Sequence, residues 1–228
     1  MKTIGVLGGI GPQATMDLEA RLHAWAQRVN PQPWGNSGYP PLIVYYHREP
    51  PIAVEADGRA THPLTPNPRL LDAARRLGQW CDFLLIGSNG VHEIQQEIES
   101  SAGKPVLSMV DTVVEEVRRR QWKRVGTLTL FGADVYRSAL SRFGVDCVSV
   151  DDQLQDGLNR GALALMAGSE TDEDRQAARH AVETLRRDGV DGIILGCTEF
   201  PFLVGEAATD ILNPVELLAE AAVRRAMD

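Results

Sequence analysis

The stretch Thr3-Ile-Gly-Val-Leu7, followed at once by Gly8-Gly-Ile-Gly-Pro-Gln-Ala-Thr15, decides the fold. An apolar run, a glycine-rich turn and a helical pattern that extends to about Val29 predict a strand, a tight turn and a helix. Alternating helices and strongly apolar strands are typical of parallel sheets covered on both faces, so we predict an α/β fold. Further apolar runs of strand length lie at residues 41–46, 82–86, 104–108, 124–129, 145–150 and 192–196.

The two halves of the chain repeat one arrangement. Each opens with a strand and a glycine turn, at residues 5–11 and 126–132, and later carries an apolar strand that ends in a small residue and a polar cluster, at 87–89 and 196–198. We therefore expect two similar lobes, each a mostly parallel sheet flanked by helices, formed by residues 1–106 plus 208–228 and by residues 107–207. Because ligands in such sheets bind beyond the carboxyl ends of the strands, we expect the active site in the cleft between the lobes.

Composition and charge narrow the class of protein. The 228 residues carry a formal net charge of −8, which argues against nucleic acid or a membrane surface as the partner. The apolar runs are shorter than a membrane span, and the start of the chain is too glycine-rich for a signal peptide, so we expect a cytoplasmic protein. The three cysteines and five histidines show no metal-ligand spacing, so we expect no metal site and no disulfide framework.

The glycine turn formally matches the dinucleotide-binding pattern Gly-x-Gly-x-x-Ala after a strand. Pro12 removes a backbone donor where a phosphate would be held, and Glu49, the first acidic residue after the second strand, lies well beyond the expected distance of about 20 residues. Nicotinamide binding therefore stays an alternative. The favoured interpretation is a tight turn whose free amide groups, around Gly9 and Gly11, bind a carboxylate.

A serine stands where the strand at residues 82–86 gives way to a helical pattern. Ser88 resembles the nucleophile of a hydrolase, but Ile86 occupies the position where the pattern Gly-x-Ser-x-Gly needs its first glycine. A serine hydrolase is thus a second alternative. His92 lies one turn after Ser88 and is placed to support that loop.

Among the cysteines, Cys197 has the surroundings of a working thiol. It follows an apolar strand and precedes Thr198 and Glu199, and a helix start with backbone amides would stabilise a thiolate whose unperturbed pKa is about 8.5. Cys81 precedes a strand and Cys147 lies within one, so we interpret both as small buried hydrophobic residues.

Three of these motifs together resemble the aspartate/glutamate racemase family. They are Gly5-Val-Leu-Gly-Gly-Ile-Gly-Pro-Gln-Ala-Thr15, Gly87-Ser-Asn-Gly-Val-His92 and Leu195-Gly-Cys-Thr-Glu-Phe-Pro201. The resemblance covers essentially the whole chain in order. It implies two facing α/β lobes, a small carboxylate-bearing substrate, acid/base catalysis by one cysteine from each lobe, no pyridoxal phosphate or other cofactor, no metal, and a homodimer.

Carried over residue by residue, the resemblance assigns roles to the second-lobe motif. Cys197 is the catalytic acid/base of that lobe, and Thr198 is the neighbour that binds the substrate carboxylate. Glu199 is the adjacent acid of the family's Cys-Thr-Glu sequence. Reversible racemisation needs an acid and a base on opposite faces of the substrate, so the first-lobe motif is equally important.

The first-lobe motif departs from the family pattern Cys-Asn-Thr-Ala-His. Asn89 and His92 are kept, but the cysteine is replaced by Ser88 and the threonine by Gly90, which enlarges the site. The family's loop after the second strand is poorly kept, and Arg48 is the candidate clamp for a carboxylate. A serine hydroxyl is a poorer base than a thiolate but a less impaired proton donor.

One thiol leaves three interpretations open. In the first, the enzyme is a racemase. Cys197 abstracts a proton from one enantiomer, and Ser88 or water returns a proton to the opposite face, which gives slow or one-directional racemisation. In the second, the enzyme is a one-cysteine decarboxylase of the arylmalonate type, whose carbanion needs a donor on one face only. In the third, the chain is a catalytically silent carboxylate-binding protein. In the racemase and in the decarboxylase, the backbone amides around Gly9, Ser88 and Cys197 would stabilise the negative charge that develops on the substrate carboxylate.

Overall fold

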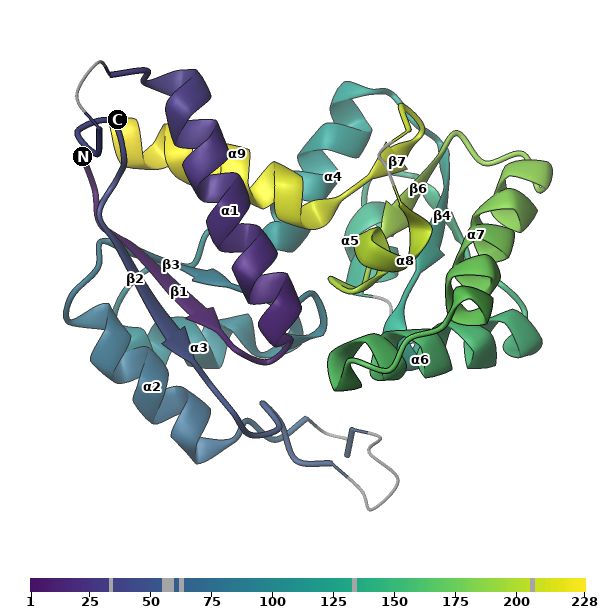
Figure 1. Ribbon diagram of the computed structural model, residues 1–228, viewed down its shortest axis with the longest axis horizontal. Helices are drawn as coiled ribbons and strands as arrows, with labels where there is room; N and C mark the ends of the chain where they lie inside the picture. Colours follow the sequence, from purple (N-terminus) through teal and green to yellow (C-terminus); the bar gives the residue numbers. More distant parts are fainter. Residues whose placement is uncertain (33–34, 55–59, 62–63, 133–134, 206–207) are drawn as a thin grey trace. The chain divides into compact units, whose positions relative to one another are not determined.

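The computed structural model describes residues 1–228 except 33–34, 55–59, 62–63, 133–134 and 206–207. The chain forms two compact units, Met1–Met109 with Val215–Asp228 and Val110–Pro214. Each unit contains one parallel sheet flanked by helices, as predicted for an α/β fold (Figure 1). The second unit extends further than the expected residue 207, because the strand at Ile211–Leu212 pairs with the sheet of that unit.

The first unit is built on a sheet of three parallel strands in the order β2-β1-β3. The central strand β1 (Ile4–Gly8) is buried along its whole length between β2 (Leu42–Tyr46) and β3 (Phe83–Ile86). Successive side chains of a strand point to opposite faces, so Val6 enters one hydrophobic cluster and Leu7 another.

Helices cover both faces of this sheet (Figure 1). On one face α1 (Pro12–Val29) and α9 (Pro214–Met227) share a hydrophobic cluster with β1 and β3. On the other face α2 (Pro68–Gly78) and α3 (Gln95–Ala102) share a second cluster with the same strands. The apolar character of β1 and β3 follows from this burial on both sides.

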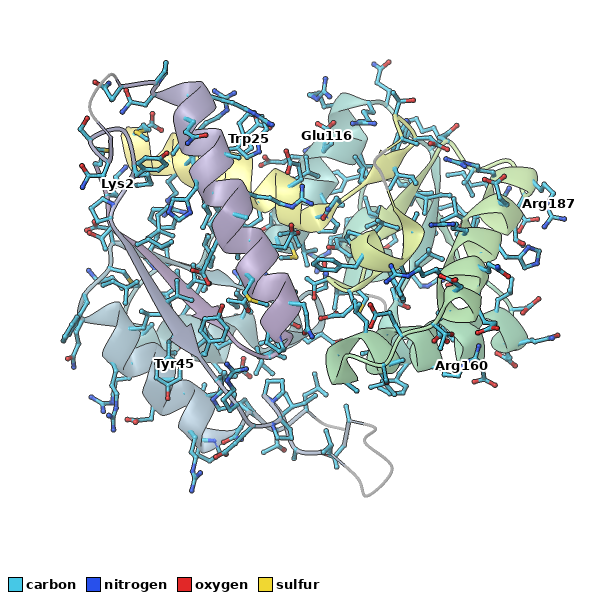
Figure 2. The ribbon with its side chains drawn as sticks, in the orientation of Figure 1. Lys2, Trp25, Tyr45, Glu116, Arg160 and Arg187 are labelled. Carbon is cyan, nitrogen blue, oxygen red and sulfur yellow. The ribbon has the colours of Figure 1, made fainter. Side chains whose placement is uncertain are left out.

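Side chains on the surface of the first unit connect α1 to α9 through a hydrogen bond and an ion pair. Trp25, labelled in Figure 2, projects from α1 and donates its indole N–H to the Glu216 carboxylate of α9 at 3.0 Å. Arg21 of α1 forms an ion pair with the same carboxylate. The chain ends lie side by side, because the Lys2 N–H donates to the Ala226 carbonyl at 2.8 Å.

Residues 104–108 were expected to form a full strand and do not. The segment runs beside β3, where the Leu84 N–H donates to the Pro105 carbonyl and the Leu107 N–H donates to the Leu84 carbonyl, but the pairing is limited to a single bridge between Leu84 and Val106. Pro105 has no N–H to donate, and a helix begins at Met109, so the ladder is short.

The second unit is built on four parallel strands in the order β5-β4-β6-β7. They are β4 (Arg124–Leu128), β5 (Asp146–Val148), β6 (Gly192–Leu195) and the short β7 (Ile211–Leu212). Since β4 and β6 are parallel neighbours, the loops that follow them meet at one edge of the sheet.

Three helices of the second unit, α6 (Asp152–Ala167), α7 (Asp172–Arg187) and α8 (Phe200–Val204), share a hydrophobic cluster with β4 and β6. A capping box of Thr171 and Asp174 starts α7, in which each side chain accepts the other residue's backbone N–H. Within the described ranges, no helix is long and apolar enough to cross a membrane. The unit is completed by α4 (Met109–Arg119), the short 3-10 turn η2 (Leu130–Gly132) and α5 (Val135–Ser141).

Candidate active site

The predicted site residues all lie in loops at the carboxyl ends of strands. In the first unit these loops begin at Gly9 after β1, at His47 after β2 and at Gly87 after β3. In the second unit the loop after β6 begins at Gly196 and follows the same edge as the loop after β4. Parallel α/β sheets bind ligands at this edge, so each unit presents one coherent set of candidate groups.

The glycine turn after β1 is shaped by close packing. Gly9 has a φ of +80°, and a Cβ atom on it would lie 2.6 Å from the Tyr46 Cα, so only glycine fits there. The Gly9 N–H donates to the Thr15 hydroxyl at 2.8 Å, and that hydroxyl donates to the Gly11 carbonyl at 3.1 Å. The expectation of a free Gly9 amide for a carboxylate is therefore wrong, because Thr15 occupies it. The role of Gly11, the residue before α1, stays a prediction.

The turn after β3 places Ser88 two residues before the 3-10 helix η1 (Gly90–Ile94). Ser88 is half-buried, Asn89 is buried, and Gly90 is exposed with open space where a side chain would stand. The enlargement of the site by Gly90 stays a prediction.

The hydrogen bonds of His92 support this turn and define which ring nitrogen carries the proton. The Met109 backbone N–H donates to Nε2 of His92 at 3.0 Å, so Nε2 is unprotonated. Nδ1 therefore carries the proton and donates it to the Ser88 carbonyl at 2.8 Å. The neutral imidazole thus connects the Ser88 turn to the first residue of α4, which is the support that the sequence indicated.

Arg48 follows β2 at the same edge as the glycine turn. Its guanidinium is exposed and stacks on the ring of Tyr46, 4.8 Å from the ring centroid. The stacking holds the charge at the edge of the first-unit sheet, and the role of Arg48 as a carboxylate clamp stays a prediction.

His47 is a candidate that the sequence did not suggest. It directly follows β2, its backbone N–H donates to the Gly8 carbonyl at 2.8 Å, and its side chain is buried. Nε2 has no hydrogen-bond partner among the residues that the structure describes. Burial lowers the pKa of His47, with the Glu49 carboxylate acting in the opposite direction. A polar residue directly after a predicted buried strand was the available signal.

The turn after β6 holds the most organised group of side chains. Cys197, Thr198 and Glu199 are all buried, with exposed fractions of 6%, 5% and 2%. The Cys197 thiol donates to Oε2 of Glu199 at 3.0 Å, and the Thr198 hydroxyl donates to the same oxygen at 2.9 Å. In the described part of the chain, Oε1 of Glu199 has no hydrogen-bond partner.

Burial and charge make Cys197 a weak acid. Burial, followed by the negative charge of Glu199, raises the pKa of the thiol well above its ordinary value. Burial also raises the pKa of Glu199, and the hydrogen bonds from Cys197 and Thr198 offset part of that increase. The Cys197 thiol and the Thr198 hydroxyl both donate to one carboxylate oxygen, so the arrangement is that of a protonated thiol beside an ionised carboxylate.

One expectation for this turn needs correction. A thiolate stabilised by a helix start was expected, but burial, followed by the negative charge of Glu199, raises the pKa of Cys197 and so favours the protonated thiol. The Thr198 hydroxyl donates to Glu199 in this arrangement, and the role of Thr198 in binding the substrate carboxylate stays a prediction. Glu199 itself is the acceptor that organises the turn.

The other two cysteines lie in the hydrophobic interior, as predicted. Cys81 packs in the cluster of α2 and α3, where its sulfur lies against Gly5, and Cys147 is buried in β5. Both are free thiols. Where the chain is described, no group of three or more His, Cys, Asp or Glu side chains is arranged to hold a metal ion.

Comparison with known proteins gives the family. Residues 7–226 match the family model described as Asp/Glu/Hydantoin racemase. The broad specificity amino-acid racemase RacX of Bacillus subtilis (strain 168) is 24% identical over 214 residues, which cover 91% of this chain and 90% of that protein. A glutamate racemase of Desulforudis audaxviator is 28% identical over 163 residues, which cover 67% of this chain and 58% of that protein.

Solved structures agree in fold. An aspartate racemase from Picrophilus torridus superposes with a TM-score of 0.80 at 19% identity and covers 100% of this chain and 95% of its own. An aspartate racemase homologue from Pyrococcus horikoshii OT3 has a TM-score of 0.75 at 22% identity, with both chains covered completely. Because the family model spans nearly the full sequence, the chain belongs to the Asp/Glu/Hydantoin racemase family and is an isomerase of the racemase class.

Proposed function

We propose that this enzyme racemises a small carboxylate-bearing substrate at the carbon next to the carboxylate, using its own side chains rather than a cofactor. Cys197 exchanges the proton on one face of that carbon, with Glu199 as its proton acceptor. Ser88, or water that it holds, serves the other face. The observation that carries the proposal is the buried hydrogen bond from the Cys197 thiol to the Glu199 carboxylate.

The proton steps follow from that hydrogen bond. Glu199 takes the thiol proton through Oε2, and the resulting thiolate removes the proton from the substrate carbon. The carbon then receives a proton on the opposite face from the Ser88 hydroxyl or from water, and solvent restores that donor. Glu199 finally returns its proton to solvent. Protons taken up and released are equal over the cycle.

The raised pKa of Cys197 supports its use as a carbon base. A carbon-bound proton is a weak acid, so a base with a high pKa removes it with a larger driving force. The cost is that little thiolate exists in the resting enzyme. The Glu199 carboxylate, which is hydrogen-bonded to the sulfur at 3.0 Å, is the acceptor placed to take the proton when the thiolate forms.

The charge that develops on the substrate carboxylate needs donors. Backbone amides of the Ser88–Gly90 and Cys197–Thr198 turns and the guanidinium of Arg48 are the candidates. Glutamate or aspartate, named in the description of the family, and the broader amino-acid range named for the Bacillus subtilis relative are the first substrates to examine.

Proton NMR in heavy water tests the proposal. We expect the signal of the α-proton to disappear and the other enantiomer to appear when the enzyme is incubated with one enantiomer of its amino acid. Exchange without inversion would mean that Cys197 serves one face alone. Loss of carbon dioxide from a substituted malonate, with no exchange in any amino acid, would contradict racemisation and identify a decarboxylase.

A homodimer is the proposed assembly, since the resemblance to the racemase family implies it. Light scattering during size-exclusion chromatography measures the mass directly. A mass of twice the 24.9 kDa chain is expected, and a mass of one chain would contradict the assembly.

A further inference from the structure

Phe131, three residues after the end of β4 at Leu128, has an unusual backbone. Its φ of 54° and ψ of 23° lie in the left-handed region, which disfavours residues with a bulky side chain. Its side chain is nevertheless 43% exposed. An exposed ring contributes less to the core than a buried one, and residues with a strained backbone gather at functional sites.

Side chains of α6 hold Phe131 in this conformation. The Phe131 N–H donates to the side-chain oxygen of Asn159 at 2.7 Å. Gln155 donates to the same oxygen at 2.8 Å and to the Thr129 carbonyl at 2.8 Å. Figure 2 labels Arg160, the residue after Asn159, and so marks this part of α6. The loop is thus held at the Thr129 carbonyl and at the N–H of the strained residue itself.

The same loop lies against the turn that carries Cys197. Leu128 of β4 pairs with Leu195 of β6, so the two loops leave the sheet side by side. A Cβ atom on Gly196 would lie 2.9 Å from the Leu128 carbonyl oxygen and 3.0 Å from the Thr129 methyl group. Phe131 therefore belongs to the loop that leaves the sheet beside the turn of the proposed catalytic thiol.

Phe143 shows how an exposed phenylalanine of the same unit is otherwise accommodated. It is 45% exposed, but the Arg118 guanidinium stacks on its ring at 4.3 Å from the centroid. No cationic side chain of the described residues stacks on the Phe131 ring in this way. The backbone of Phe143 also lies outside the left-handed region.

We propose that Phe131 determines substrate specificity by presenting an apolar, aromatic surface to the substituent on the reacting carbon. The inference rests on the proposed function, since it assigns a substrate class to that site. It predicts carboxylates with an apolar or aromatic substituent as preferred ligands, ahead of the second carboxylate of aspartate or glutamate. An aromatic ring favours an apolar or aromatic neighbour and offers a carboxylate no hydrogen bond.

Two unreactive ligands test this preference by NMR titration of the intact enzyme. They are 3-phenylpropanoate, which has the carbon skeleton of phenylalanine, and succinate, which has that of aspartate. We expect the wild type to bind 3-phenylpropanoate more tightly. Phe131→Ala should weaken that ligand by about three- to tenfold and change succinate by less than about twofold. Phe143→Ala, the matched control, should change neither.

A measurement of Tm distinguishes a role of Phe131 in ligand binding from a role in stability. Phe131→Gly relieves the backbone strain, so it should raise Tm while it loses the preference for 3-phenylpropanoate. The inference is overturned if the wild type prefers succinate, or if Phe131→Ala leaves both affinities unchanged or lowers both equally. Racemase activity is measured separately by α-proton exchange, so selective binding without exchange would contradict the proposed function and leave the specificity of Phe131 standing.

Discussion

The Cys197 sulfur lies 3.0 Å from Oε2 of Glu199, and both side chains are buried. Thr198 donates to the same oxygen, so the carboxylate is held by two neighbours from its own turn. A thiol and a carboxylate in contact away from water form a coupled pair, in which the position of one proton decides which group is charged. The proposed proton transfer depends on this pair.

Replacement of the carboxylate should reduce catalysis without loss of the thiol. We expect Glu199→Gln to lower kcat by about 10²- to 10⁴-fold, because the thiol loses its proton acceptor. In the wild type kcat/KM should rise with pH as Glu199 ionises, with an apparent pKa above the ordinary carboxyl range, since burial raises that pKa. The Gln variant should lack this rise. A kcat within about threefold of the wild type would contradict the role of Glu199.

The raised pKa of Glu199 also predicts how stability depends on pH. Between the ordinary value of 4.5 and the higher folded value, the folded chain holds a proton that the unfolded chain has lost. The free energy of unfolding therefore falls as the pH rises through that window. Glu199→Gln cannot ionise, so its stability relative to the wild type should increase over the same window and then level off. Urea unfolding at steps between pH 4 and 8 measures the difference, and a constant difference would contradict the shift.

Substitutions at Ser88 test the second proton-transfer position. Ser88→Ala should lower racemisation by less than about 10²-fold, because water is able to replace a hydroxyl that is a poor acid. Ser88→Cys should increase it, since a thiol is a far better acid and base than an alcohol at neutral pH. Initial rates with each enantiomer, followed by circular dichroism, provide the comparison. A Ser88→Cys variant no faster than Ser88→Ala would place Ser88 outside the reaction.

Two glycines of the first unit should respond differently to the same substitution. Gly9→Ala puts a methyl group 2.6 Å from the Tyr46 Cα at a φ of +80°, so we expect a loss of about 2 kcal/mol in stability. Gly90→Ala places its methyl group in open space and should change stability by less than about 0.5 kcal/mol. Equal losses in urea unfolding would contradict the packing described for the glycine turn.

The fold was predictable because its determinants are local. The strand at the start of the chain is buried on both faces, and its continuous run of apolar residues reports that directly. The helix α6 was not predicted, since Gly157 and Gly161 interrupt its apolar pattern. Gly157 faces α7, and a Cβ on Gly161 would meet Leu203 of α8 and Asp174 of α7. β7 is only two residues long and carries no periodic signal.

The candidate site was predictable in position but not in electrostatics. The sequence placed Ser88, Cys197 and Glu199 in loops after strands, where the structure has them. It did not show that Glu199 turns its carboxylate toward the thiol, or that burial of both groups raises the pKa of each. Side-chain direction and burial depend on contacts between distant segments, which spacing along the chain does not encode.

Exchange of the substrate α-proton for deuterium, measured by proton NMR for the wild type and for Cys197→Ala, is the most direct test of the central claim. The account predicts exchange with the wild type and none above background with Cys197→Ala. Cys81→Ala and Cys147→Ala, which remove buried thiols elsewhere, should exchange at the wild-type rate. A Cys197→Ala enzyme that still exchanged at the wild-type rate would contradict catalysis by this thiol.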